Sequence, residues 1–95
     1  MILEGAFPTI APMPTKLEYA EQLVTDVLAG DESAIVSGAT ALQPLVNAEW
    51  STVLGHLITK AGELPITAPE DLDALIVYMD FYSVGIREAI KRGET

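Results

Sequence analysis

The apolar side chains of this chain recur at intervals of three and four residues, and this spacing is the feature that most constrains its fold. Such stripes continue from about residue 16 to residue 92, interrupted by glycine and proline residues. This interval places side chains on one face of an α-helix, whereas a strand with one buried face requires strict alternation. The sequence contains no alternating hairpin pattern. We therefore predict an all-α fold, a small bundle of three long helices and one short helix.

Capping residues indicate where the helices begin. Thr15 and Glu18 have the spacing of a capping box, in which a hydroxyl and a carboxylate satisfy the first free amide groups of a helix. Thr67 and Glu70 repeat this pattern before the last helix, and Asp31 suits the N-cap of the second helix. Together with the glycine and proline breaks, the caps predict helices at about 16–29, 31–42, 44–61 and 69–92, and a short tail at 93–95.

Two residues interrupt the helical pattern in the middle of the chain. Gly38 lies inside the second helix, where glycine costs about 1 kcal/mol relative to alanine. Pro44 lacks an amide hydrogen and suits the first turn of a helix, so we expect the third helix to begin there. The apolar stripe of this third helix continues over four turns: Val46, Trp50, Val53, Leu54, Leu57, Ile58 and Ala61.

The last helix is apolar on more than one side. Its first face carries Leu72, Leu75, Ile76, Met79, Ile86 and Ile90. A second arc carries Tyr78, Phe81, Tyr82 and Ala89. A single helix cannot bury both arcs against two modest neighbours, so it is either the central helix of the bundle or a helix with an exposed interface. We assign Tyr78, Phe81 and Tyr82 to such an interface.

An apolar arm at residues 1–15 precedes the first helix. Prolines at positions 8, 12 and 14 forbid a continuous helix there. About 14 residues in a polyproline-like conformation reach roughly 40 Å, more than the ~26 Å that a domain of this size spans as twice its radius of gyration. The arm can therefore cross to a neighbouring molecule or fold back over its own bundle. Its large apolar residues are candidate interface residues: Ile2, Leu3, Phe7, Ile10 and Met13.

Composition narrows the class of partner. Fourteen acidic residues against five basic ones give a formal charge of −9, which disfavours direct binding to nucleic acid or to anionic membranes. No apolar run approaches the ~20 residues of a membrane span, and the first residues lack the basic region of a secretory signal. The absence of cysteine excludes disulfides and zinc–thiolate sites. We expect a cytoplasmic protein, or one inside a host cell or virion, without contact with a membrane.

Few residues are suited to catalysis. His56 is the single histidine, and we place it on the polar side of the third helix as a solvated surface residue. The serines lack the nucleophile-elbow context, and a catalytic triad would have to use His56. The acidic cluster at 70–73 lacks the twelve-residue loop and central glycine of an EF-hand, and its charges instead favour a helix N-terminus. We expect no enzymatic activity, no metal and no cofactor.

Two functions fit these features. The first is a non-enzymatic assembly module that binds copies of itself or a larger structure through the arm and the aromatic helix face. A small virion or bacteriophage accessory protein is one candidate of this kind. The alternative is an acidic inhibitor or antitoxin-like protein that masks a basic, nucleic-acid-binding surface of an enzyme. The acidic residues available for that role are Glu18, Glu21, Asp26, Asp31, Glu32 and the cluster at 70–73.

Overall fold

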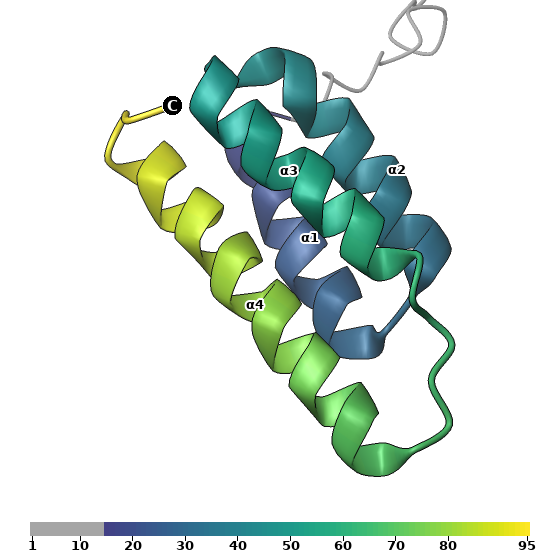
Figure 1. Ribbon diagram of the computed structural model, residues 1–95. Coiled ribbons are helices and arrows are strands. Elements are labelled where there is room, and N and C mark those ends of the chain that lie inside the picture. Colours follow the sequence, from purple (N-terminus) through teal and green to yellow (C-terminus); the bar gives the residue numbers. More distant parts are fainter. Residues whose placement is uncertain (1–14) are drawn as a thin grey trace, which may run out of the picture.

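The computed structural model describes residues 15–95, which form an all-α bundle of four helices (Figure 1). The helices are α1 (Lys16–Ala29), α2 (Glu32–Leu42), α3 (Ala48–Ala61) and α4 (Pro69–Lys91), with a short 3-10 helix, η2 (Gln43–Leu45), between α2 and α3. Residues 15–95 contain no strand, and the prediction of an all-α fold is confirmed. The predicted arm interface residues Ile2, Leu3, Phe7, Ile10 and Met13 lie outside the described residues.

Consecutive helices run up and down the bundle. At each end of the molecule, segments that are far apart in the sequence therefore come into contact. At one end, Lys16 Nζ donates to Thr95 Oγ1 at 3.0 Å, and the Asn47 amide donates to the Thr95 carbonyl oxygen at 2.6 Å. At the other end, a Cβ added to Gly30 would lie 3.8 Å from Ile76 Cδ1. The turn between α1 and α2 therefore lies beside the first turns of α4 (Figure 1).

The first two helices have the predicted caps. Thr15 Oγ1 accepts from the Glu18 amide at 3.2 Å, and Glu18 Oε1 accepts from the Thr15 amide at 2.9 Å. Gly30 follows α1 with φ 65°, a left-handed conformation that glycine adopts without a steric penalty. Asp31 Oδ1 then accepts from the Ala34 amide at 3.2 Å and caps α2.

The predicted start of the third helix at Pro44 is wrong. Pro44 lies within η2, Val46 is extended, and α3 begins only after Asn47. The Asn47 side chain accepts from the Trp50 amide at 3.0 Å and supplies the N-cap that sets the start of the helix. Gln43 Nε2 donates to the Ser51 carbonyl oxygen at 3.1 Å, which ties η2 to the first turn of α3.

The second predicted capping box is also wrong, although α4 begins at the predicted residue. Proline is favoured at the first helical position, and Pro69 occupies it in α4. This makes Ala68 the N-cap and leaves Thr67 one residue too early, so no side chain caps α4.

The core draws large side chains from every helix. Its fully buried members include Leu23 and Val27 of α1, Ile35 and Leu42 of α2, Leu54 and Leu57 of α3, and Met79 and Ile86 of α4. The predicted core face of α4 lies in this core: Leu75, Met79 and Ile86 are buried, and Leu72, Ile76 and Ile90 pack against them.

Two apolar residues show how the position around a helix axis decides burial. Leu28 is 60% exposed, because it follows Val27 by one position and is therefore rotated by about 100° around the axis of α1. Ala89, which we placed on the aromatic arc, is fully buried because it shares the core-facing side of α4 with Ile86, three residues before it.

Candidate functional site

The helices α3 and α4 leave a groove between them. Each of the pairs α1–α4, α1–α2 and α2–α3 packs more extensively than the pair α3–α4. Helix α4 is therefore an edge helix that rests mainly on α1, and it is not the central helix of the bundle (Figure 1). At one place where α3 and α4 approach each other, a Cβ added at Gly85 would lie 3.8 Å from Trp50 Cη2.

This groove is apolar and has a volume of about 490 Å³. Its lining residues are Trp50, Val53, Asp80, Phe81, Tyr82, Val84 and Gly85. Since only one of these seven residues is charged, the groove offers contact area to an apolar side chain and little polar chemistry.

Four rings form a continuous aromatic cluster along the groove. The Tyr78 and Tyr82 ring centroids lie 5.1 Å apart, and Phe81 meets the Tyr82 ring edge to face at 5.3 Å. His56 of α3 adds contacts at 5.6 Å to Tyr78 and at 6.0 Å to Tyr82. Such tilted and edge-to-face pairs are favourable aromatic geometries. The cluster holds Tyr78 and Tyr82 half-buried, whereas Phe81 remains 72% exposed.

The end of the cluster nearer the α3–α4 connection is polar. The Tyr78 hydroxyl and His56 Nε2 are hydrogen-bonded, and Lys60 Nζ lies 5.2 Å from the centre of the Tyr78 ring. Lys60 also pairs with Glu63 at 3.3 Å. Desolvation by the surrounding side chains, together with the neighbouring Tyr82 hydroxyl, raises the pKa of Tyr78 above its ordinary value. The Tyr78 phenol therefore stays protonated at neutral pH and acts as a hydrogen-bonding group.

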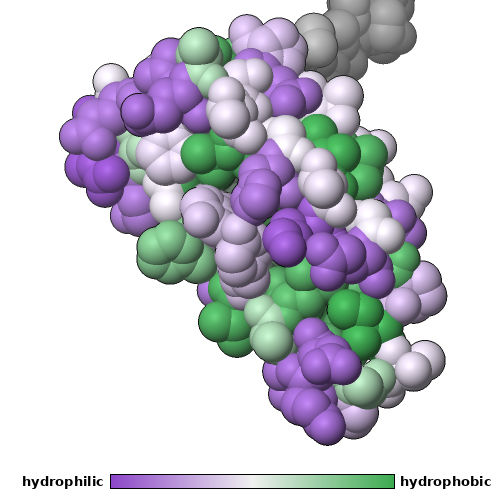
Figure 2. All heavy atoms as spheres, viewed as in Figure 1, coloured by the Kyte–Doolittle hydropathy of each residue, from purple (hydrophilic) through white to green (hydrophobic). Residues whose placement is uncertain are grey.

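The outer face of α4 carries an apolar stripe. Val77 and Phe81, four residues apart, are 69% and 72% exposed, and the half-buried Val84 follows three residues later. Figure 2 shows apolar surface along the edge of the molecule that α4 forms, next to the polar C-terminal turns of that helix. Single exposed apolar residues are ordinary on protein surfaces, but a contiguous patch of large ones marks an interaction site.

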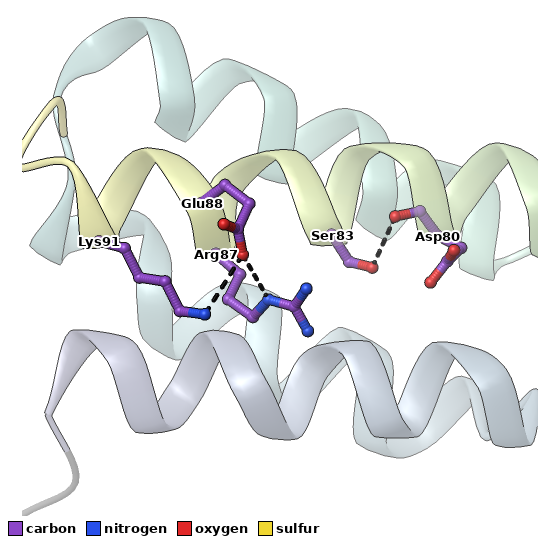
Figure 3. A network of polar contacts seen from close by, with 5 residues as sticks. All are labelled: Asp80, Ser83, Arg87, Glu88 and Lys91. Atoms are coloured by element: carbon purple, nitrogen blue, oxygen red, sulfur yellow. Dashed lines mark hydrogen bonds and ion pairs between the residues drawn. The ribbon is translucent and has the colours of Figure 1, made fainter.

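A polar network lies on the side of α4 that faces α1 (Figure 3). Glu88 Oε2 accepts from Arg87 Nε at 3.0 Å and pairs with Lys91 Nζ at 3.4 Å. The hydrogen bond from Arg87, reinforced by Lys91, lowers the pKa of Glu88 below its ordinary value. The fully buried Ser83 donates its hydroxyl to the Asp80 carbonyl oxygen at 3.1 Å. These contacts are internal to α4.

The structure brings the three predicted helix residues, Tyr78, Phe81 and Tyr82, together on one surface, and their role as an interface stays a prediction. His56 is exposed as expected, but it belongs to the aromatic cluster rather than standing free in solvent. Four further residues of this surface were missed by sequence reasoning: Trp50, Val53, Val77 and Gly85. The four-residue spacing of Val77 and Phe81 could have shown that they share a face of α4. The contact of Trp50 with Gly85 could not be predicted in this way, because it depends on how α3 crosses α4.

The described part of the chain gives no sign of a metal or membrane site. Within residues 15–95, no three histidine, aspartate or glutamate side chains are grouped so as to hold a metal ion. None of the helices there has the length and apolar character needed to cross a membrane. Comparisons of the chain with protein-family models, curated proteins and solved structures found no match, so function is inferred from this surface alone.

Proposed function

We propose that this protein is a non-enzymatic assembly module that binds copies of itself, alone or within a larger structure, through its N-terminal arm and the outer face of α4. The observation that carries the proposal is the exposure of Val77 and Phe81, at 69% and 72%, side by side on an edge helix. The half-buried rings of Tyr78 and Tyr82 extend this surface toward the groove.

The energetics favour covering this face. Fully burying a large apolar side chain contributes about 1.5–3 kcal/mol. Because Val77 and Phe81 are more than two-thirds exposed in one copy, most of this contribution is still available to a partner. The ring of Phe81 is already oriented by its contact with Tyr82 at 5.3 Å, which lowers the entropy lost when a partner packs on it.

The arm is attached where it can reach the same face. Residue 15 precedes α1 at the end of the bundle where Lys16 contacts Thr95, just beyond the last turn of α4. Phe81 lies ten residues before Lys91, or about 15 Å along the helix axis. A 14-residue extended segment, at roughly 40 Å, covers this distance on its own bundle or on a neighbouring copy.

The proposal assigns no catalytic role to His56. Its contacts are with the rings of Tyr78 and Tyr82 and with the Tyr78 hydroxyl, and no carboxylate orients it as a general base among residues 15–95. We place the protein in a cytoplasm or, if it is a viral component, in a host cell or virion. A virion or bacteriophage accessory protein is one kind of assembly module with this size, acidity and apolar arm.

Sedimentation equilibrium of the full chain, from micromolar to millimolar concentration, tests the proposal. We expect concentration-dependent association that Phe81→Ser weakens by about tenfold or more, since the substitution removes most of one large apolar contact. Leu45→Ser is the control, because Leu45 is 41% exposed but lies on η2, which packs against α2 and α3. A chain that remains monomeric at every concentration, or one equally weakened by both substitutions, would contradict the proposal.

The alternative, an acidic inhibitor, is favoured by one observation. The turn after α1, with Asp31 and the neighbouring Glu32 at the start of α2, lies beside the first turns of α4, which carry the acidic cluster at 70–73. One end of the bundle is therefore strongly acidic. Ionic strength separates the two functions, because apolar association persists or strengthens at high salt, whereas binding to a basic partner weakens steeply as charges are screened.

A further inference from the structure

We propose that two copies of this chain pair through α4 in an antiparallel arrangement, with a twofold axis close to Asp80 and Phe81. This inference rests on the proposed self-assembly and specifies its geometry. The apolar stripe, the distribution of charge along α4 and the register of its flanking residues each support it.

The apolar stripe has the spacing of a helix-pairing seam. Ala74, Val77, Phe81 and Val84 follow one another at intervals of three, four and three residues. Alternating intervals of three and four residues keep one line of side chains facing a partner helix over successive turns. Ala74, Val77 and Phe81 are exposed and Val84 is half-buried, so the seam lies on the side of α4 that the bundle leaves uncovered.

The charges on α4 select the antiparallel orientation. Its first turns carry Glu70, Asp71 and Asp73, whereas the other end carries the bases Arg87, Lys91 and Arg92 with the acids Glu88 and Glu94. Three acids therefore stand at one end, and an excess of one positive charge stands at the other. A parallel pair would place the acidic ends together, and it would also align the two helix dipoles unfavourably. An antiparallel pair places the acidic end of each helix beside the basic end of the other, and a twofold axis makes the two halves of the interface identical.

The flank of the seam fixes the register. Asp73, Asp80 and Arg87 lie at seven-residue intervals along one edge of the stripe. In an antiparallel pair centred near residue 80, Asp73 of each copy faces Arg87 of the second copy. In the same register Val77 packs near Val84 of the second copy, and Asp80 lies opposite its own counterpart. Among the polar contacts of residues 15–95, Arg87 uses only Nε, for Glu88.

The extent of the seam predicts a weak dimer. A helix of 23 residues is about 35 Å long and 10 Å wide, so pairing covers roughly 350 Å² per copy. The total, about 700 Å², is below the 1,200–2,000 Å² of stable complexes. The net charge of −9 on each copy also opposes association, so moderate salt should strengthen the dimer. The two Asp80 side chains that face each other also repel and weaken the dimer. Asp80→Asn should therefore strengthen association.

Cross-linking of single-cysteine variants of the full chain tests the geometry, because the natural sequence contains no cysteine. The probe is a bismaleimide that spans about 10 Å, the distance between the axes of packed helices. Asp80→Cys should cross-link to its own counterpart. Two copies of Asp73→Cys would lie about 21 Å apart along the axis and should not react together. A mixture of Asp73→Cys with Arg87→Cys should cross-link efficiently. Thr40→Cys, an exposed position on α2, is the control that should not.

Charge reversal provides a second test that does not depend on a cross-linker. Asp73→Lys and Arg87→Glu should each weaken association by about fivefold or more, because each creates two like-charge contacts. The combined variant exchanges the two charges and should restore association. Asp73 and Arg87 would meet only across the interface between two copies. Restored association in the combined variant would therefore exclude the explanation that either single substitution acts by damaging the fold.

The outcomes separate this inference from the proposed function. Cross-linking of Asp73→Cys to itself in preference to Arg87→Cys would show a parallel pair. Association without any cross-link on α4 would place the interface elsewhere. Either result overturns the antiparallel geometry and leaves self-assembly standing. A full chain that stays monomeric at millimolar concentration defeats both.

Discussion

Met79 and Phe81 lie two residues apart on α4, and replacing each with alanine should separate the stability of the fold from the strength of its association. Met79 is fully buried in the core, so Met79→Ala should cost about 2–5 kcal/mol of unfolding free energy. Phe81 is 72% exposed, and less than a third of its side chain is covered by its own bundle. At about 25 cal/mol per Å² and roughly 200 Å² for a phenylalanine, that covered part contributes at most about 1.5 kcal/mol.

The higher helix propensity of alanine, roughly 0.5 kcal/mol above phenylalanine, offsets part of this loss. We therefore expect Phe81→Ala to change the unfolding free energy of the monomer by less than about 1 kcal/mol. Urea unfolding by circular dichroism, at low micromolar concentration where α4 pairing is dissociated, measures both variants under the same conditions. A Phe81→Ala variant as unstable as Met79→Ala would mean that Phe81 belongs to the core, and the interface on α4 would then have to be abandoned.

Three further substitutions test the local structure. Gly85→Ala should stabilise α4 by about 0.5–1 kcal/mol, because its Cβ would meet Trp50 at an ordinary 3.8 Å, and an unchanged or lower melting temperature would show that the groove is tighter than described. Asn47→Ala should cost about 1 kcal/mol by removing the cap of α3. A smaller loss for Asn47→Ala than for Asn47→Gly would contradict a capping role. Hydrogen bonds from Thr15 lower the pKa of Glu18 below its ordinary value of 4.5, so this carboxylate stabilises the fold above pH 4.5 and ceases to do so as the pH falls through the lowered pKa. Unfolding of Glu18→Gln across this acidic range should show a shallower pH dependence than the natural chain, and identical profiles would refute the capping box.

The helices of this protein could be predicted largely from local signals. The Thr15 and Glu18 capping box, the left-handed Gly30 and the Asp31 cap each depend on residues within one turn, and the structure has all of them. The start of α3 was missed because Pro44 and Asn47 both suit a helix N-terminus. The asparagine side chain satisfies a free amide group, whereas proline only tolerates the position, and this difference decided the outcome.

The surface on α3 and α4 was only partly predictable. Helical spacing was enough to place Tyr78, Phe81 and Tyr82 on a common arc. It did not reveal that His56 would contact Tyr78 or that Trp50 would pack on Gly85, because these neighbours depend on how two helices cross. It also assigned Ala89 to the exposed arc, although Ala89 follows the buried Ile86 by three residues and lies on the same side of α4.

The most direct test of an interface on α4 is a dilution series of the full chain followed residue by residue in ¹H–¹⁵N correlation spectra. We expect the amide signals from about residue 74 to residue 85 to shift with concentration between low micromolar and millimolar. The signals of α2, which lies away from this face, should stay constant. Spectra that do not change over this range, or shifts confined to α2 while α4 stays constant, would contradict a self-association surface centred on Phe81.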